Sequence, residues 1–187
     1  MAVTLLIARH GQTEENAAHI LQGQMPGRLT AEGIEQAREM RDRLKDARID
    51  IVFSSDLRRA TDTAAIICEA HGGHFTTEPL LRERNFGKYT GKPYINISRA
   101  IDDPEAETME QVASRAVQFL TRVARECDGK TVLAVSHGLF LRVLQSVFHH
   151  ADIHDIPRME NAEIRTLTLT PGQEFTAAIE EVGTTEN

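Results

Sequence analysis

The sequence predicts an α/β fold, a three-layer α/β/α sandwich with a mostly parallel central sheet, from three apolar runs and the helical patterns between them. The runs have the length of strands and cover residues 4–8, 51–54 and 131–135. Because each is apolar throughout, it is typical of a parallel strand that is buried on both faces. Strands that alternate with helices along the chain favour a sheet with helices on both sides.

Four segments of helical pattern accompany these runs. In three of them apolar residues recur every three or four positions, which places them on one face of a helix. The three faces consist of Ile34, Ala37, Met40 and Leu44; of Leu57, Ala60, Ala64 and Ile67; and of Val112, Ala116, Phe119 and Val123. The third helix should begin at Thr108, whose hydroxyl can cap it while Gln111 bonds back. A fourth helix is expected over about residues 139–148.

The chain of 187 residues contains no internal repeat, low-complexity tract or linker. A single domain over residues 1–187 is therefore expected. Near the end of the chain, residues 165–170 and 175–180 flank Pro171 and Gly172 and predict a closing pair of strands.

Composition excludes several classes of protein. A formal net charge of −7 argues against general binding to nucleic acid or to acidic membrane surfaces, which both need a basic field. No apolar run approaches the length of a bilayer span, and the run after Met1 is too short for a signal sequence. The two cysteines, Cys68 and Cys127, lie in helical patterns without a paired spacing. A cytoplasmic protein with structural thiols is expected.

Two of the predicted strands end in closely similar sequences. Residues 4–11 read TLLIARHG and residues 131–138 read TVLAVSHG, so each run leads into a histidine and a glycine. Open α/β sheets bind ligands at the carboxyl ends of their strands, and the amides of a following helix favour an anion. One such histidine is as often structural as functional. The pair, His10 and His137 in matching contexts, predicts an anion site.

Two further segments carry polar residues that fit such a site. Arg59 lies near the start of the helix that follows residues 51–54, where it can point toward the strand ends. The alternative is a surface arginine in a salt bridge. Glu83 lies in a loop before Phe86 and Gly87, and this loop by itself indicates no function.

Taken together, these segments resemble the histidine phosphatase superfamily, also called the phosphoglycerate mutase-like family. The resemblance rests on residues 9–16 (RHGQTEEN), residues 29–37 (LTAEGIEQA), residues 55–60 (SDLRRA), Glu83 with Phe86 and Gly87, and residues 136–138 (SHG). These motifs follow the order found in the family and span most of the chain. The resemblance implies the phosphoglycerate mutase-like version of the α/β/α fold.

The resemblance also implies a role for each matched residue. His10 would attack phosphorus and form a phosphohistidine, while Arg9, Arg59 and His137 bind the phosphoryl oxygens. Glu83 would donate a proton to the leaving oxygen, and for this it should be buried beside Phe86. The family pattern assigns phosphate or substrate binding to Asn16, Gly138, Gln22, Gly23 and Gln24. No metal and no cofactor are then required.

Electrostatics refines the two histidine roles. The positive charges of Arg9 and Arg59 should lower the pKa of His10 and keep its attacking nitrogen unprotonated. His137 lies beside the phosphate dianion in this scheme, so its charged form should be favoured. The two histidines are therefore expected in opposite protonation states.

The sequence departs from the family pattern in ways that bear on the substrate. Residues 25–28 (MPGR) replace the usual acidic residue and proline, and residues 86–91 (FGKYTG) replace the usual aromatic-glutamate-glycine ending. Only 53 residues separate Glu83 from His137, whereas mutases of the family have a longer enclosing segment there. Hydrolysis of a small phosphorylated metabolite is therefore favoured, with mutase activity as the alternative. The sequence leaves open whether the protein forms a homodimer.

Two other interpretations of the sequence remain. Residues 149–155 (HHADIHD) look like a metal-binding cluster, since His150 and His154 would share a face if the helix continued. The helix is expected to end near Phe148, however, and Pro157 follows, which favours a polar loop. A non-catalytic binding module of the same fold is disfavoured because His10, Arg59, Glu83 and His137 are all present.

Overall fold

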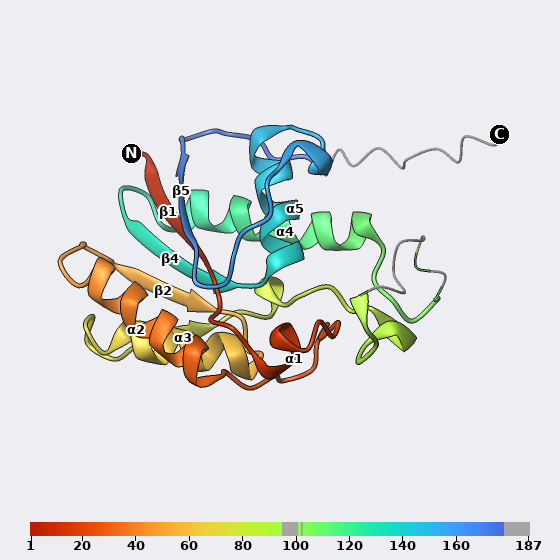
Figure 1. Cartoon of the computed structure of the whole chain (residues 1–187). Helices are drawn as coiled ribbons and strands as arrows, with labels where there is room; N and C mark the ends of the chain where they lie inside the picture. Colours follow the sequence, from red (N-terminus) through yellow and green to blue (C-terminus); the bar gives the residue numbers. More distant parts are fainter. Residues whose placement is uncertain (95–100, 102, 178–187) are drawn as a thin grey trace.

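The computed structural model describes residues 1–94, 101 and 103–177. A five-stranded sheet with the order β3-β2-β4-β1-β5 forms its centre (Figure 1). The strands are β1 (Val3–Arg9), β2 (Ile51–Ser54), β3 (Thr76–Thr77), β4 (Thr131–Ser136) and β5 (Ile164–Leu169). Strands β1 to β4 are parallel to one another, and β5 runs antiparallel to β1.

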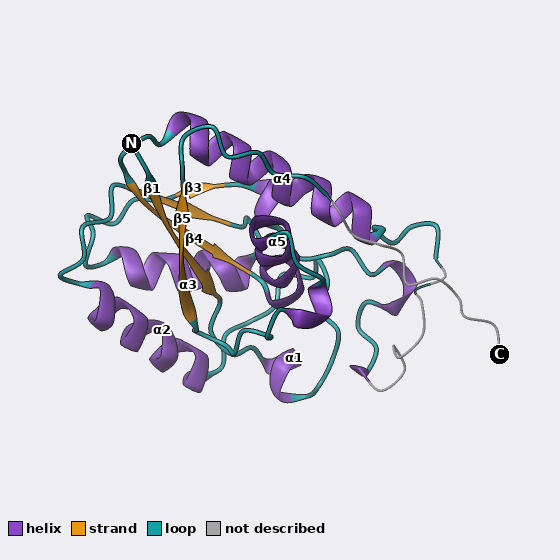
Figure 2. Ribbon diagram, turned by 90° about the horizontal axis from the view of Figure 1, so that it is seen from above, coloured by secondary structure: helices purple, strands orange, loops and turns teal. Residues whose placement is uncertain are grey.

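Helices cover both faces of this sheet, as the sequence predicts. They are α1 (Glu14–Ala17), α2 (Ala31–Leu44), α3 (Arg58–Cys68), α4 (Met109–Glu126) and α5 (Gly138–His149). Helices α2 and α3 pack together on one face, and α4 and α5 pack together on the other (Figures 1 and 2). None of the described helices is long and apolar enough to cross a membrane.

Alternating side chains of the central strands fill two hydrophobic cores. On β4, Val132 and Ala134 belong to the core beneath α4 and α5, whereas Leu133 and Val135 belong to the core beneath α2 and α3. Strand β4 therefore buries apolar side chains on both faces. This two-sided burial accounts for continuous apolar runs in place of an alternating pattern.

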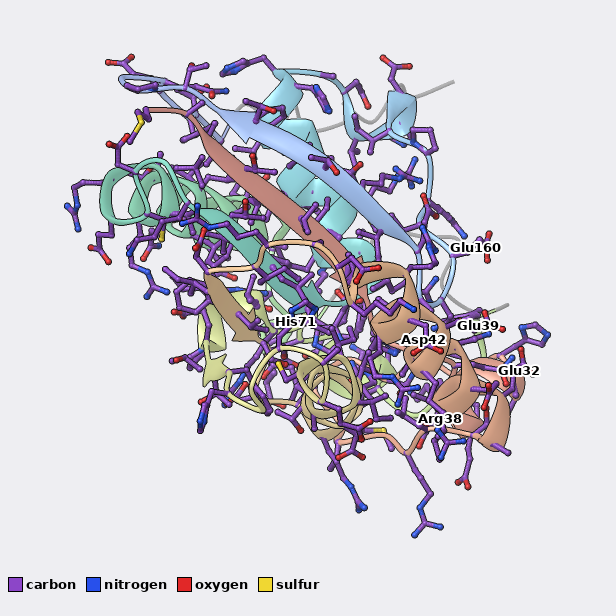
Figure 3. All side chains as sticks on the ribbon, turned by 90° about the vertical axis from the view of Figure 1, so that its left-hand side faces the viewer. Glu32, Arg38, Glu39, Asp42, His71 and Glu160 are labelled. Atoms are coloured by element: carbon purple, nitrogen blue, oxygen red, sulfur yellow. The ribbon has the colours of Figure 1, made fainter. Side chains whose placement is uncertain are left out.

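The predicted helices form with their expected faces and ends. Thr108 caps α4: its Oγ1 accepts from the Gln111 amide at 3.2 Å, and the Gln111 side chain accepts from the Thr108 amide at 2.8 Å. The charged side chains of α2, among them Glu32, Arg38 and Asp42, project away from the sheet (Figure 3). Helix α5 ends one residue later than expected.

The predicted closing pair of strands is wrong in its second half. Residues 164–169 form β5, but residues 175–177 form no strand, and residues 178–180 lie outside the described residues. Phe175 is buried instead by stacking on Phe148 of α5, with ring centroids 6.4 Å apart. Burial of one aromatic ring in the core thus replaces strand pairing at this position.

Candidate active site

The carboxyl ends of β1 and β4 bring the two predicted histidines together. The strands are in register so that Arg9 lies opposite Ser136, and His10 and His137 follow directly. Their ring centroids are 5.2 Å apart, and both side chains are buried. The predicted convergence of these strand ends is therefore present in the fold.

The hydrogen bonds of His10 define which of its nitrogens can react. Its Nδ1 lies 2.7 Å from the carbonyl oxygen of Gly11, which can only accept, so Nδ1 carries the proton and donates. The Nε2 lone pair is left, and the Nε group of Arg59 donates to it at 3.3 Å. Burial, and then the charges of Arg59 and Arg9, hold the pKa of His10 well below its usual value. The expected neutral ring is supported.

Gly11 lets the chain continue after His10 through a very narrow space. A Cβ atom at this position would lie 2.3 Å from the carbonyl oxygen of Gly33 in α2, closer than any side chain can come. The Gly11 amide donates to Thr63 Oγ1 at 3.1 Å, and Thr63 in turn donates to the Arg59 carbonyl at 2.7 Å. These contacts join the His10 loop to the first turn of α3.

Arg59 belongs to the site and is not a surface salt-bridge residue. It lies in the first turn of α3 and only 1% of it is exposed. Its guanidinium donates to the carbonyls of Gly23 at 2.7 Å, of Met25, and of Pro26 at 3.4 Å. Burial lowers its pKa to about 10, so it stays charged at neutral pH. Arg59 thereby connects His10 to the loop around Gly23.

Arg9 lies against the start of α5. Its Nη1 donates to the Met159 carbonyl at 2.6 Å, while its buried Nε has no hydrogen-bond partner among the described residues. A Cβ atom on Gly138 would lie 3.2 Å from this Nε. A glycine at the first position of α5 therefore lets the guanidinium approach the helix amides.

His137 is held at the end of β4 by a serine hydroxyl. Its Nε2 lies 2.7 Å from the Ser55 hydroxyl, and its buried Nδ1 has no partner among the described residues. Burial, followed by the charge of Arg59, holds the pKa of His137 well below its usual value. The prediction that a phosphate dianion favours the charged form of His137 stays a prediction, whereas burial beside the arginines by itself favours the neutral ring.

Glu83 is buried, as expected, and lies at the amino end of α5. Its carboxylate accepts from the amides of Leu139 and Phe140, both at 3.1 Å, and from the amide of Arg84 at 2.8 Å. Only 9% of Glu83 is exposed. Phe86 lines the same cavity, so the predicted neighbours are both in place.

The segment that carries Glu83 is held by hydrogen-bond donors on β4 and α4. Ser136 Oγ donates to the Leu81 carbonyl at 2.7 Å, and Arg115 donates to the carbonyls of Leu80 and Arg82. The end of β4 therefore fixes both His137 and the chain just before Glu83.

The predicted substrate-binding residues divide into two groups. Gln22, Gly23, Asn16 and Gly138 line the cavity, and the buried Gln22 Oε1 has no partner among the described residues. Gln24 does not line it: its Nε2 donates to the Glu83 carbonyl at 3.2 Å. The structure therefore gives Gln24 a supporting position and not one in the wall.

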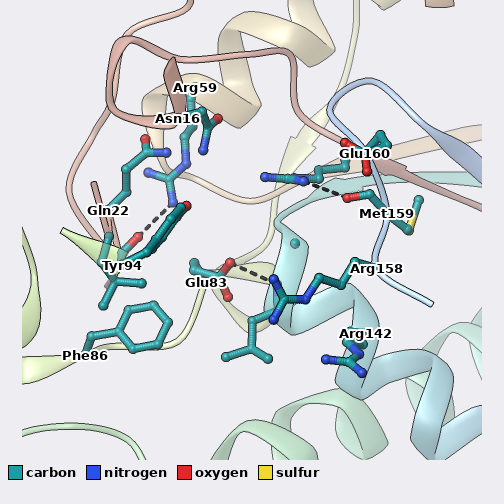
Figure 4. Close-up of a pocket in the computed structure, with 15 residues that line it drawn as sticks. Asn16, Gln22, Arg59, Glu83, Phe86, Tyr94, Arg142, Arg158, Met159 and Glu160 are labelled. Carbon is teal, nitrogen blue, oxygen red and sulfur yellow. Dashed lines mark hydrogen bonds between the residues drawn. The ribbon is translucent and has the colours of Figure 1, made fainter. Parts of the chain in front are cut away.

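A cavity of about 680 Å³ opens over these residues (Figure 4). Its walls are formed by Arg9, Asn16, Leu21, Gln22, Gly23, Arg59, Glu83, Phe86, Tyr94, Gly138, Leu139, Arg142, Arg158, Met159 and Glu160. The histidines lie beneath this surface, since 2% of His10 and none of His137 is exposed. A group bound in the cavity would thus meet the guanidiniums and amides first.

Several residues of the site were not singled out by the sequence analysis. Ser55 opens the motif of residues 55–60, whose sequence predicts no role for it, yet it contacts His137. Asn161 donates to the His10 carbonyl at 3.1 Å and to Asn16 Oδ1 at 3.2 Å. Nothing in the local pattern around Asn161 indicates this, because the contact depends on the chain returning beside β1. Arg158 was missed for the same reason, whereas Arg142, four residues after Gly138 on α5, could have been found from helical spacing.

The histidine-rich segment after α5 does not form one helical face. The helix ends at His149, His150 is left-handed with φ 50°, and His154 lies on a separate 3₁₀ turn, Ile153–Asp155. His154 Nδ1 bonds Asp152 Oδ1 at 2.8 Å. Over the residues described, no group of three metal-binding side chains comes together.

Comparison with known proteins identifies the family. The sequence profile of the histidine phosphatase superfamily (branch 1) matches residues 5–181. The chain belongs to the histidine phosphatase superfamily. Among its relatives, a protein named probable phosphoglycerate mutase GpmB from Erwinia tasmaniensis is 35% identical over 154 residues, 75% of this chain and 72% of that protein.

Solved structures of this superfamily share the fold. Phosphoserine phosphatase from Entamoeba histolytica, in complex with 3-phosphoglyceric acid, superposes with a TM-score of 0.78 at 26% identity, over 88% of this chain and 89% of that one. A mycobacterial glucosyl-3-phosphoglycerate phosphatase gives a TM-score of 0.77 at 25% identity, over 90% and 91%. The predicted family and the predicted phosphoglycerate mutase-like fold are therefore confirmed.

Proposed function

We propose that this histidine phosphatase hydrolyses a small phosphate monoester through a phosphohistidine on His10. The observation that carries the proposal is the state of His10: Nδ1 is committed to the Gly11 carbonyl, so the lone pair that would attack phosphorus is on Nε2, to which Arg59 Nε donates at 3.3 Å. Membership of the superfamily, and solved neighbours that are phosphatases, support the same reaction.

In the first step the phosphoryl group binds among the donors at the strand ends. Arg9 supplies a guanidinium that matches the phosphoryl oxygens, and Asn16 supplies an amide. Arg59 supplies its charge and the Nη2 hydrogen that is not bonded to Gly23, because its other N–H groups bond His10 and the loop carbonyls. Two early amides of α5, those of Leu139 and Phe140, are taken by Glu83. The Gly138 amide is left to donate to the phosphoryl group. Phosphoryl transfer depends mainly on such positioning and charge, and these residues supply both without a metal.

The bond changes then follow in two stages. His10 Nε2 forms a bond to phosphorus as the bond from phosphorus to the leaving oxygen breaks, and Glu83 in its protonated form gives that oxygen a proton. In the second stage a water oxygen attacks phosphorus, the Nε2–phosphorus bond breaks, and the Glu83 carboxylate takes the water proton. Inorganic phosphate is released, and both side chains return to their starting states.

His137 acts as a neutral donor in this scheme. Ser55 Oγ already accepts from the Leu57 amide at 3.3 Å, and the acceptor within reach of its single hydroxyl proton is His137 Nε2. If Ser55 donates there, the proton of the neutral ring is on Nδ1, the atom without a protein partner. Nδ1 then donates to a phosphoryl oxygen, and no charged imidazole is needed.

Mutase activity is the second candidate. Relatives named probable phosphoglycerate mutase favour it. The interval of 53 residues between Glu83 and His137 favours hydrolysis, because a mutase must shield its phosphoenzyme from water until it transfers the phosphoryl group again.

We also propose a reducing, cytoplasmic location. Cys68 and Cys127 are both free and buried, and burial raises the pKa of each thiol. Such thiols are unreactive and structural, which suits a compartment without disulfide formation.

The test is a screen of phosphate monoesters with the wild-type protein and with His10→Ala, scored for free phosphate and for isomerised product. Free phosphate that depends on His10 supports the phosphatase. Isomer without free phosphate would replace it by the mutase, and turnover that survives in His10→Ala would overturn both.

A further inference from the structure

The cavity extends beyond the residues needed for phosphoryl transfer. Its volume of about 680 Å³ lies in the range of pockets that enclose a whole small molecule, and a phosphoryl group fills only a small part of it. The part of the substrate that distinguishes one ester from another must therefore be bound by the outer walls.

These outer walls differ in chemistry. Figure 4 shows Phe86 and Tyr94 on one side of the cavity and Arg142 and Arg158 on the other, with Glu83 between them. The side of the arginines is formed by α5 and by the loop after it, and no step of the proposed reaction uses either guanidinium. A cationic wall with no role in the chemistry indicates a role in recognition.

Arg142 is placed by α5 itself. It lies four residues after Gly138, so the two positions share a helix face, about 6 Å apart along the axis. Its Nε donates to the Ile156 carbonyl at 2.7 Å and its Nη2 to the His154 carbonyl at 3.4 Å. These contacts hold the loop that carries Arg158 beside the cavity, and they leave Nη1 of Arg142 for another acceptor.

The two guanidiniums are not neutralised within the protein. Burial and the nearby charge of Arg158 lower the pKa of Arg142, so the two positive charges repel each other. Across the described part of the chain, neither residue forms a salt bridge with a carboxylate. Asp152 opposes the repulsion only in part, because it is bonded to the amide and ring of His154. Of the acidic residues that line the cavity, Glu83 accepts from three backbone amides, and Glu160 lies next to Met159, whose carbonyl Arg9 binds (Figure 4).

We propose that Arg142 and Arg158 form a subsite for a second anionic group of the substrate, such as a carboxylate, separated by a short linker from the phosphate. An anion there relieves the repulsion between the guanidiniums and meets donors arranged for planar oxygens. The inference rests on the proposed function, because the phosphoryl end of the cavity fixes where the rest of the substrate lies.

The test compares 3-phosphoglycerate with glycerol 3-phosphate, which differ in having a carboxylate or a hydroxymethyl group at the far end. The values of kcat/KM are measured for the wild type, Arg158→Gln and Arg158→Glu, with Arg125→Gln on the exposed side of α4 as the control. Arg158→Gln should lose about tenfold with 3-phosphoglycerate, as for one charge-assisted hydrogen bond, and stay near the wild-type value with glycerol 3-phosphate. Arg158→Glu should lose more, and Arg125→Gln should lose nothing with either ester.

Both esters are also measured as competitive inhibitors of aryl phosphate hydrolysis, so that an ester that turns over slowly still reports its binding. Equal affinity of the wild type for the two esters, or equal losses with both in the Arg158 variants, would overturn the subsite. Aryl phosphate hydrolysis in His10→Ala separates the two proposals. If that activity is lost, the proposed function stands whatever the fate of the subsite; if it persists, the proposed function fails, and inhibitor binding alone decides the subsite.

Discussion

The ends of β1 and β4 have almost the same sequence and lie side by side, yet their histidines expose different nitrogens. His10 bonds the backbone through Nδ1 and turns Nε2 toward Arg59, whereas His137 bonds a serine through Nε2 and leaves Nδ1 without a partner among the described residues. Both rings are buried and both pKa values are lowered. The difference between them therefore comes from hydrogen-bond partners and not from charge. A nucleophile and a hydrogen-bond donor can share one local motif when outside groups select the tautomer.

The largest expected effect separates the two histidines. His10→Ala should abolish both turnover and phosphoenzyme formation, because the attacking nitrogen is gone. His137→Ala should lose on the order of 10²-fold to 10³-fold in kcat, the cost of one preorganised donor, and should still form the phosphoenzyme. Rapid-quench labelling of both variants checks this. Equal labelling of the two, or labelling of His10→Ala alone, would reverse the assignment.

Glu83→Gln should give the next largest effect, and its size should depend on the leaving group. The amide keeps the shape of the side chain but cannot donate an acidic proton, so alkyl phosphates should lose on the order of 10²-fold or more. Aryl phosphates, whose leaving oxygen needs little protonation, should lose less. A series of esters with graded leaving groups measures this, and a loss independent of the leaving group contradicts the role.

Removing Arg59 should shift the pH dependence of kcat/KM. The charge of Arg59 helps keep the pKa of His10 low, so Arg59→Met should raise that pKa toward its usual value of about 6.5. Because His10 must be unprotonated to attack, the acid limb of kcat/KM should move to higher pH, with an overall loss of about 100-fold from the missing phosphoryl donor. Arg58→Met, an exposed neighbour in the same turn, is the matched control and should leave the profile unchanged. An acid limb that stays in place in Arg59→Met counts against this electrostatic role.

Ser55→Ala should have a smaller effect that tests the tautomer directly. Without the hydroxyl donor, the neutral ring of His137 should no longer be held with its proton on Nδ1, and kcat should fall by about tenfold. Nitrogen NMR of the ring distinguishes the two tautomers in wild type and variant. Ser146 is a buried serine on α5, so Ser146→Ala controls for the loss of a buried hydroxyl. An unchanged tautomer in Ser55→Ala would refute the role of Ser55.

The same comparison shows what a sequence can predict and where it stops. The strand ends could be predicted because apolar runs of strand length and a following glycine are local features, and local features also placed Arg59 in the first turn of α3. The partners that distinguish the histidines could not be predicted. Ser55 meets His137 only through the pairing of β2 with β4, and Asn161 meets His10 only through the return of the chain before β5.

Short or irregular elements also could not be predicted from the local sequence. Strand β3 has two residues, too few for any periodicity, and exists through its pairing with β2. Residues 175–177 have a strand-like composition, but Phe175 is stabilised by the ring of Phe148 and not by a neighbouring strand. Gln24 was expected in the cavity wall, and its contact with the Glu83 carbonyl was not foreseen. In each case a contact distant in sequence determines the structure.

The most direct test of the central claim is phosphorus and nitrogen NMR of the phosphoenzyme, trapped by rapid base quench during turnover of a phosphate monoester. A phosphoramidate on Nε2 of His10, absent in His10→Ala and retained in His137→Ala, is the result that the proposed roles predict. Phosphate attached to Nδ1 of His10, to His137, or to no histidine at all while turnover continues would contradict them.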